Sequence, residues 1–321
     1  MAVYLGVDFG TRNIEIYVKG KGIVLREPNV AAVDAYGNVT AVGTEALLIH
    51  GRAPGTVTLR RPYSGGAIND FNLTAELLDR FLEAAAPKVK KHIIASVKYS
   101  LDEGSRELLR KAFSDCRTGK IELVDSTVAA LKGCGFDPGD SDNGYGGTVV
   151  CDIGADTVDV SYIRGGELLR SKSMPSGGNA QDSAMIAYIR NKYSLAVEES
   201  EILEAKHKLA LSPHKPAGIE IFGLDTSTGM PRRIVADETD LTKLCAAHVK
   251  IVAQIIGDTL NNLPRHGDKQ SHADRIILVG GGAKLPGIHE YLEAYLECNV
   301  TVATSPLDAT VQGLGIMCEK M

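Results

Sequence analysis

Two aspartates, Asp8 and Asp152, lie in nearly identical phrases that are far apart in the chain. VDFGTRNIEI spans residues 7–16 and CDIGADTVDV spans residues 151–160. Apolar residues alternate with other residues on both sides of each Asp-x-Gly, which predicts a strand, a tight turn and a second strand. The glycine of each turn allows the backbone N–H groups to point at one cluster of phosphate oxygens. The sequence therefore predicts two phosphate-binding hairpins.

The aspartates add a cation to this hypothesis. A carboxylate at a strand end, beside phosphate oxygens, suits Mg²⁺, because this ion takes only one or two protein carboxylates and keeps several waters. Asp8 and Asp152 are therefore predicted to share one hydrated ion. A single Asp-x-Gly hairpin is common turn chemistry that needs no ligand. Its duplication favours two similar domains that face each other with a nucleotide between them.

Two glycine-rich stretches in the second half of the chain fit the same arrangement. Gly177 and Gly178 precede residues 179–193, where apolar residues recur at helical spacing, and a glycine pair at a helix start can receive a phosphate. The triplet 280–282 joins an apolar strand, 276–279, to an amphipathic helix. A turn without side chains would let an adenine ring or a ribose lie against the backbone. The alternative, that the triplet only satisfies strand-to-helix packing, stays open.

The composition is that of an ordinary globular chain of 321 residues, which is long enough for two domains. Charged residues make up 23% and the formal net charge is −5, without long blocks of either sign, so no electrostatic binding of nucleic acid is expected. The six cysteines form no C-x-x-C pair, and we expect reduced thiols and a cytoplasmic protein. No signal peptide is recognisable, and no apolar run approaches the about 18 residues of a membrane span.

In their order and spacing, the two hairpins, the Gly-Gly helix start and the glycine triplet resemble the actin, Hsp70 and sugar-kinase superfamily of ATP-binding folds. Within it the chain is similar to the MreB family of bacterial actin-like cell-shape proteins. Two stretches are specific to that branch: YVKGKGIVLREP at 17–28 and RPYSGGAINDF at 61–71. Chaperones and kinases of the superfamily differ there.

The resemblance implies an α/β, actin-like (ribonuclease H-like) fold with duplicated domains and a nucleotide cleft between them. The glycines and aspartates of 135–147 are typical of a crossing between domains. The expected boundaries are 1–144 for domain I with an insertion at about 33–65, 145–304 for domain II with an insertion at about 185–250, and a C-terminal helix at about 305–321 that returns to domain I.

The resemblance also implies ATP and Mg²⁺ as cofactors, with Asp8 and Asp152 near the metal. Carried over residue by residue, the nucleotide-binding positions fall on both hairpins, on the helix start, on the adenine side and on the turn beneath the nucleotide. They are Asp8, Gly10, Thr11, Arg12, Asn13, Asp152, Gly154, Ala155, Asp156, Thr157, Gly177, Gly178, Asn179, Leu203, Glu204, Lys206, Gly280, Gly281, Gly282, Ala283 and Lys284.

Several positions depart from the family pattern. The glutamate that orients the attacking water in this family corresponds to Ser126, with Asp125 one residue away, and these two are the candidate catalytic residues. Loss of such an acid–base group typically costs about 10²–10⁴ in rate, so ATP hydrolysis is expected to be slow or nearly absent. Ala155 and Asp156 replace glycines of the second hairpin, and Leu203 replaces a glutamate on the adenine side.

The function expected from the resemblance is that of an ATP-binding cytoskeletal protein. Its subunits would stack head to tail into filaments that act in cell shape and in the organisation of cell-wall synthesis, with the cell-wall elongation machinery as a partner. The expected location is the cytoplasm, at the inner face of the cell membrane. Membrane contact would be weak or indirect, because Lys88, Lys90 and Lys91 form only a small basic patch. The alternative is a non-polymerising actin-fold adaptor or assembly factor.

Overall fold

The chain divides into two compact units. The computed structural model describes residues 2–52, 55–136, 146–211, 217–263, 265–266, 269–270 and 272–321. The first unit comprises Met1–Asp140 and Leu307–Met321, and the second comprises Ser141–Pro306. Residues 137–145, which make up most of the expected crossing between domains, lie outside the described residues.

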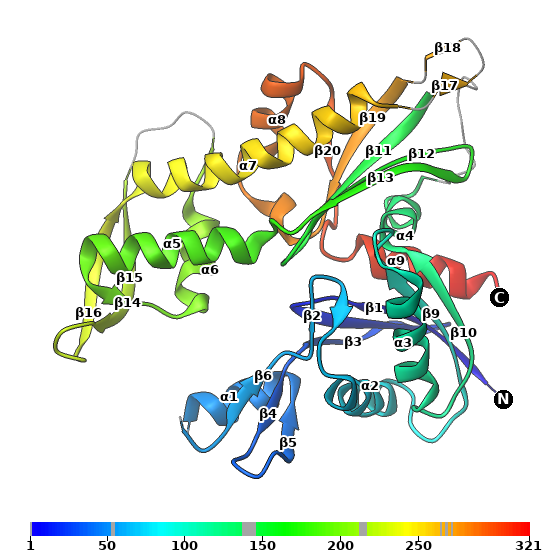
Figure 1. The fold of residues 1–321 in the computed structure, drawn as a ribbon, viewed down its shortest axis with the longest axis horizontal. Coiled ribbons are helices and arrows are strands. Elements are labelled where there is room, and N and C mark those ends of the chain that lie inside the picture. Colours follow the sequence, from blue (N-terminus) through cyan, green and yellow to red (C-terminus); the bar gives the residue numbers. More distant parts are fainter. Residues whose placement is uncertain are drawn as a thin grey trace. The chain divides into compact units, whose positions relative to one another are not determined.

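A five-stranded sheet forms the centre of the first unit (Figure 1). Its strands are β1 (Val3–Phe9), β2 (Asn13–Val18), β3 (Gly22–Pro28), β9 (Lys91–Val97) and β10 (Thr118–Asp125). They lie in the order β10-β9-β1-β2-β3. β1, β2 and β3 form an antiparallel meander, whereas β9 and β10 run parallel to β1.

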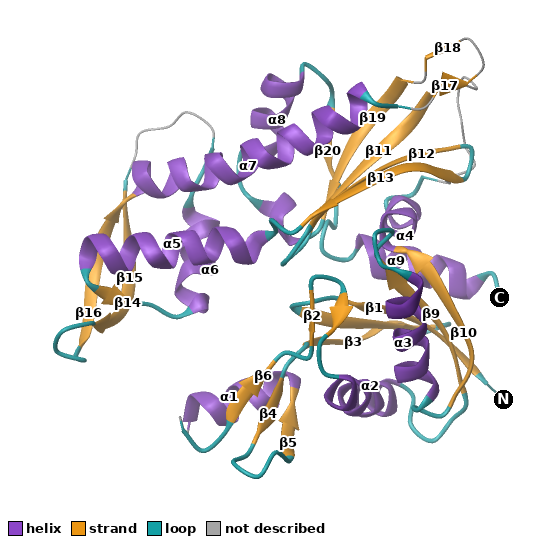
Figure 2. Cartoon of the chain, in the orientation of Figure 1, coloured by secondary structure: helices purple, strands orange, loops and turns teal. Residues whose placement is uncertain are grey.

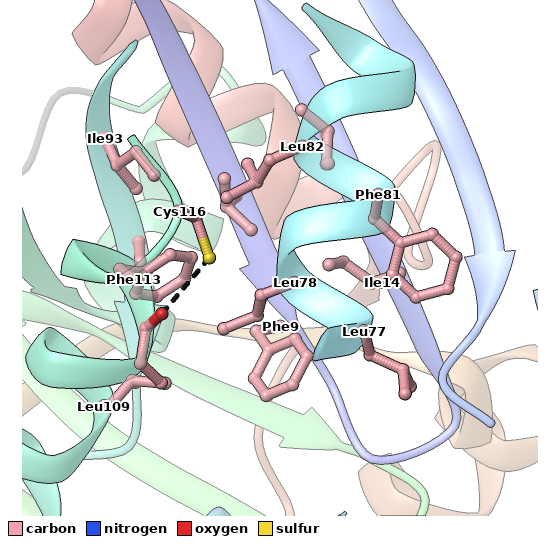
Figure 3. Packing of buried hydrophobic residues seen from close by; sticks show 14 of the residues in the cluster. Phe9, Ile14, Leu77, Leu78, Phe81, Leu82, Ile93, Leu109, Phe113 and Cys116 are labelled. Atoms are coloured by element: carbon pink, nitrogen blue, oxygen red, sulfur yellow. Dashed lines mark hydrogen bonds between the residues drawn. The ribbon is translucent and has the colours of Figure 1, made fainter. Parts of the chain in front are cut away.

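Helices α2 (Phe71–Ala85) and α3 (Glu103–Ser114) cover one face of this sheet. Because side chains alternate along a strand, every second residue of β1 and β2 is apolar and turns toward these helices. Figure 3 shows Phe9 and Ile14 beside Leu78 of α2, all of them buried. This is the main hydrophobic core of the first unit.

The opposite face carries α4 (Ser126–Gly133) and α9 (Ala309–Glu319). The two helices touch backbone to backbone, since a Cβ atom added at Gly133 or Gly313 would lie 1.8 Å from a carbonyl oxygen of the other helix. A Cβ atom on Gly6 of β1 would lie 2.8 Å from a side-chain atom of α9. Glycine is thus required at these three positions, where α9 comes closest to α4 and to β1.

The second unit repeats this sheet. Its strands are β11 (Gly146–Ile153), β12 (Val158–Arg164), β13 (Glu167–Met174), β19 (His272–Val279) and β20 (Val300–Val302). They lie in the order β13-β12-β11-β19-β20, again an antiparallel meander followed by two strands parallel to the first. Residues of α7 (Glu238–Asn261) and α8 (Ile288–Leu296) bury one face. The shared topology confirms the predicted duplication.

Each unit also contains smaller elements (Figure 2), and some of these form a separate hydrophobic cluster in each unit. The first unit has β4 (Ala31–Val33), β5 (Val39–Val42), α1 (Gly43–Arg52) and β6 (Thr58–Arg60), followed by the hairpin of β7 (Tyr63–Ser64) and β8 (Ala67–Ile68). The second has α5 (Gly178–Tyr193), β14 (Leu195–Ala196), α6 (Glu199–Lys208), β15 (Gly218–Asp225), β16 (Pro231–Asp237), the short pair β17 (Arg265–His266) and β18 (Lys269–Gln270), and the 3-10 turn η1 (Gly281–Lys284). Within the described residues, no helix is long and apolar enough to cross a membrane.

Candidate functional site

The first predicted hairpin is formed by β1 and β2. Asp8 lies directly opposite Glu15 in the strand register, so both side chains are on the face of the sheet that carries α4 and α9. The turn is closed by a hydrogen bond from the amide of Gly10 to the carbonyl of Asn13, at 3.0 Å. Thr11 lies at the tip of this turn and is buried.

The second hairpin, β11 and β12, has the same construction. Asp152 lies opposite Asp159, and the amide of Gly154 donates to the carbonyl of Thr157 at 2.9 Å. The Thr157 hydroxyl donates to Asp159 at 2.6 Å, and both side chains are buried. The two copies thus share strand register and turn closure.

The carboxylate of Asp8 is held by a residue that sequence reasoning did not identify. Ser96, near the end of β9, donates from Oγ to Oδ1 of Asp8 at 2.6 Å. Asp8 is partly exposed, yet burial raises the pKa of its carboxyl above the ordinary value, while the Ser96 hydrogen bond and the charge of Lys98 act in the opposite direction. The signal for Ser96 is a lone hydroxyl in an otherwise largely apolar strand, at its carboxyl end.

A row of charged side chains continues from Asp8 across the sheet. Arg26 of β3 lies opposite Glu15 and donates from Nε to its carboxylate at 2.6 Å, and the same guanidinium pairs with Asp308 at the start of α9. Burial, and next the charge of Asp8, raise the pKa of Glu15 to about 7 against the opposing effect of Arg26. Sequence reasoning did not assign a role to Arg26, because its partner Asp308 is distant in the chain.

The second hairpin turn is joined to the start of α5. The amides of Gly177, Gly178 and Asn179 donate to the carbonyls of Asp156, Gly154 and Ala155 at 2.9, 2.9 and 2.7 Å. The side-chain amide of Asn179 also donates to the Asp156 carboxylate at 2.8 Å. Two of the predicted segments are therefore brought together within one unit, and the first amides of α5 are used to hold the turn.

A lysine from α6 lies beside the same helix start. Lys206 forms an ion pair with Asp182 of α5 at 2.7 Å, and both side chains are largely buried. Its Nζ would lie 3.8 Å from a Cβ atom added at Gly178. The other two adenine-side candidates, Leu203 and Glu204, are on the exposed side of α6.

The glycine triplet packs against the end of β11. Gly280 has a φ of +82°, and a Cβ atom there would lie 2.3 Å from Oδ1 of Asp152. A Cβ atom at Gly282 would lie 2.2 Å from the side chain of Ile153. Close packing is therefore enough to explain why residues 280 and 282 are glycines. The approach of Gly280 also brings the triplet next to Asp152, which is a predicted site residue. Ala283 is buried and Lys284 is exposed in the 3-10 turn that follows.

The two catalytic candidates lie where β10 passes into α4. Asp125 is the N-cap of α4, and its carboxylate accepts hydrogen bonds from the amides of Thr127 and Val128 at 2.9 and 3.4 Å. Ser126 is the first residue of the helix and is buried. A carboxylate in this capping arrangement stabilises the helix start, which fixes its orientation.

The chain matches the model of the MreB/Mbl protein family over residues 2–321. The cell shape-determining protein Mbl of Bacillus cereus is 32% identical over 326 residues, which cover 99% of this chain and 96% of that protein. The cell shape-determining protein MreB of Escherichia coli K12 is 28% identical, covering 97% and 92%.

Solved structures with the same fold include two actin-like proteins. MreB5 of Spiroplasma citri bound to AMPPNP superposes with a TM-score of 0.88 at 22% identity, covering 99% of this chain and 96% of that one. MamK in a double helical filament superposes with a TM-score of 0.82 at 20% identity, covering 100% of both chains. The fold is therefore actin-like, as the sequence predicted.

Proposed function

This chain belongs to the MreB/Mbl family, and we propose that it is an actin-like cytoskeletal protein that binds ATP with Mg²⁺ and forms filaments. The observation that carries the proposal is the repeated hairpin, with the same register and the same closing hydrogen bond in each copy. Tight turns of this kind present backbone amides to anions. Relatives named for cell shape support a role in shape determination.

The groups at the two turns fit phosphate oxygens. Within the parts of the chain that the structure describes, the amides of Thr11 and Ala155 donate to no other group. A Cβ atom added at Gly178 would lie 3.8 Å from the ammonium nitrogen of Lys206, which places a positive charge beside the start of α5. The positive end of the helix dipole favours negative charge at this place.

The carboxylates fit a hydrated Mg²⁺ that is held mainly by a nucleotide. Among the described residues, no group of three or more His, Cys, Asp and Glu side chains could hold a metal ion without other ligands. Mg²⁺ bound with ATP usually takes one or two carboxylates and completes its shell with phosphate oxygens and water. Asp8 and Asp152 would be those carboxylates, and the bound ion would neutralise charge on the phosphates.

Hydrolysis of the bound ATP is proposed to be slow. The position of the water-orienting glutamate is occupied by Ser126, whose hydroxyl cannot act as a carboxylate base. The neighbouring carboxylate, Asp125, caps α4. Loss of a positioned acid–base group corresponds to about 10²–10⁴ in rate.

Filament formation is supported by the kinship with actin-like proteins, one of which was solved as a double helical filament. Head-to-tail stacking is a heterologous contact that does not close, so it generates an open filament. We place these filaments in the cytoplasm at the inner face of the membrane, with the cell-wall elongation machinery as a partner. Membrane contact would be weak or indirect.

Thermal unfolding with ligand tests nucleotide binding directly. Millimolar ATP with Mg²⁺ should raise the unfolding temperature, because a ligand that binds only the folded state stabilises it. Adenosine, which has no phosphates, should give a much smaller shift. Asp152→Ala should reduce the ATP shift, whereas Asp79→Ala, exposed on α2, should preserve it. The absence of any ATP shift in the unmodified chain would contradict the proposal and favour the adaptor function.

A further inference from the structure

The first hairpin turn is held from outside by one residue. Pro28, the last residue of β3, pairs with Asn13 of β2, which places the next residue, Asn29, beside the turn. The backbone amide of Asn29 donates to the carbonyl of Arg12 at 2.9 Å. Its side-chain amide donates from Nδ2 to the carbonyl of Gly10 at 2.8 Å. Asn29 is completely buried and thus fixes two carbonyls of the turn.

The second hairpin turn is held at the same two positions, but by backbone groups alone. The carbonyl of Gly154 accepts from the amide of Gly178, and the carbonyl of Asp156 accepts from the amide of Gly177, both at 2.9 Å. These carbonyls belong to the first and third residues of the turn, as do the two carbonyls that Asn29 holds. Asn29 therefore supplies in the first unit the two hydrogen bonds that the start of α5 supplies in the second.

These hydrogen bonds determine the direction of the turn amides. A trans peptide bond is planar, so its carbonyl and its N–H point in opposite directions. A Gly10 carbonyl that faces Asn29 therefore directs the amide of Thr11 to the other side of the turn. If this peptide flipped, it would present a carbonyl oxygen in place of an N–H donor to a bound phosphate.

The side-chain oxygen of Asn29 is a further sign that this residue serves the turn. Oδ1 is buried and has no hydrogen-bond partner among the described residues. A buried acceptor without a donor lowers stability, and such groups in folded proteins call for an explanation. A role in fixing the turn accounts for the presence of this side chain despite its cost.

We propose that Asn29 is a positioning residue for the nucleotide phosphates: it holds the Gly10–Thr11 peptide so that the Thr11 amide is directed at them before they bind. This inference rests on the proposed ATP binding. A turn that is ordered in advance loses less conformational freedom when the ligand binds. Because Asn29 acts through the turn, its effect should be confined to ligands that carry phosphates.

The test compares the affinities of AMPPNP and adenosine for the full chain in the presence of Mg²⁺. Asn29→Ala removes the side-chain donor and keeps the backbone amide. It should weaken AMPPNP binding about three- to tenfold in isothermal titration calorimetry, the scale of one net hydrogen bond. Adenosine has no phosphates, so its affinity, measured by competition with AMPPNP, should stay unchanged.

Hydrogen exchange, followed by mass spectrometry, reports on the turn itself. Without nucleotide, amides of residues 10–13 should exchange faster in Asn29→Ala than in the unmodified chain, whereas those of residues 154–157 should not change. In the unmodified chain, AMPPNP should slow exchange of the Thr11 amide and adenosine should not. This last measurement needs no variant, so it remains informative if Asn29→Ala does not fold.

Thr259→Ala is the matched control. Thr259 is completely buried in α7, and its hydroxyl donates to the carbonyl of Ile255 at 2.9 Å. This substitution also removes a buried hydrogen bond from a side chain to a backbone carbonyl, but outside both turns. It should lower the unfolding temperature and leave both affinities and the exchange of residues 10–13 unchanged.

Four results would overturn the inference. They are an unchanged AMPPNP affinity of Asn29→Ala, an equal loss of affinity for AMPPNP and adenosine, unchanged exchange of residues 10–13 in that variant, and no slowing of Thr11 exchange by AMPPNP. In each of these the unmodified chain still binds nucleotide, and the proposed function stands. Absence of AMPPNP binding by the unmodified chain would overturn the proposed function and this inference together.

Discussion

At the scale of single residues, the unusual feature of this chain is the concentration of charge around Asp8. Glu15, Arg26 and Asp308 continue from it across the sheet, with hydrogen-bonded ion pairs at both ends of the guanidinium. Glu15 is buried, and one of its carboxylate oxygens has no hydrogen-bond partner within the described chain. The negative charge of an ionised Glu15 is therefore only partly compensated by hydrogen bonds. As a result, the stability of the folded chain should depend on pH.

Stability should fall with rising pH because of Glu15. Its pKa is raised to about 7 in the folded chain from an ordinary value of 4.5, so the folded state binds more protons between these values. The stabilisation is fully present below about pH 4.5 and is lost as the pH rises through 7. Glu15→Gln should remove this dependence, so that the variant gains stability relative to the parent from pH 5 to pH 8. The free energy of unfolding of both proteins is measured by urea unfolding in EDTA at several pH values. If the two curves of stability against pH run parallel, Glu15 is not the cause of the pH dependence.

Restoring a carboxylate at position 126 should speed hydrolysis. Ser126→Glu places a carboxylate at the first residue of α4, the position predicted to correspond to the water-orienting glutamate, and should raise ATP turnover by at least tenfold. Release of phosphate under single-turnover conditions is the measurement. Ser114→Glu, on the exposed end of α3, is the control for added charge. If the parent hydrolyses ATP rapidly and substitution of residue 126 does not change the rate, the catalytic position lies elsewhere.

At the scale of elements, one contact in each unit holds candidate site residues in place. The turn of the second hairpin is joined to α5 by three backbone hydrogen bonds, and α4 crosses α9 at the glycine pair Gly133 and Gly313. The second contact depends on the absence of side chains, because the carbonyl oxygens of the partner helix lie where a Cβ atom would be. α9 begins directly after Asp308, which pairs with Arg26 of the charged row, so the crossing with α4 fixes the helix next to the first hairpin.

Gly313→Ala should destabilise the first unit strongly. Its Cβ atom would lie 1.8 Å from the carbonyl oxygen of Ala129, which forces the helices apart. Overpacking of this kind typically costs about 1–3 kcal/mol or more. Gly51→Ala in α1 is the matched control, because a Cβ atom there meets nothing within 4 Å and alanine favours a helix by about 0.5–1 kcal/mol. Chemical unfolding compares them, and an equal change in both variants would contradict the close crossing.

At the scale of the whole molecule, the chain has an actin-like fold, and we propose that its hydrolytic position is altered. The matched family extends over residues 2–321, and the solved relatives are covered almost completely. Because assembly depends on surfaces and hydrolysis depends on a few side chains, the two properties are able to diverge. Persistent filaments are the expected consequence.

ATP should produce filaments that disassemble slowly. In the presence of ATP and Mg²⁺, the sedimented fraction should rise above a critical protein concentration, and negative-stain images should show linear polymers. AMPPNP, which is not hydrolysed, should give filaments of nearly the same lifetime as ATP, since we propose that hydrolysis is weak. A protein that binds ATP but remains monomeric at tens of micromolar would contradict the filament proposal and favour the adaptor function.

The sequence by itself determined the repeated units of this protein. Strand alternation around Asp8 and Asp152, with a glycine in each turn, is local information, and it was sufficient to predict both hairpins and two similar domains. The actin-like fold itself was predicted from the resemblance to the MreB family. The helix that follows Gly177 and Gly178 was equally recognisable. These features depend on residues a few positions apart, whose backbone preferences and periodicity are visible in the chain.

Only the tertiary structure decided how the site residues are held. Ser96 reaches Asp8 because β9 pairs with β1, and Arg26 reaches Asp308 because α9 returns to the first sheet. The two residues of each contact are 88 and 282 positions apart in the sequence, so no local sequence pattern predicts these contacts. Their geometry follows from strand register and helix packing, which are fixed by burial of the whole hydrophobic core.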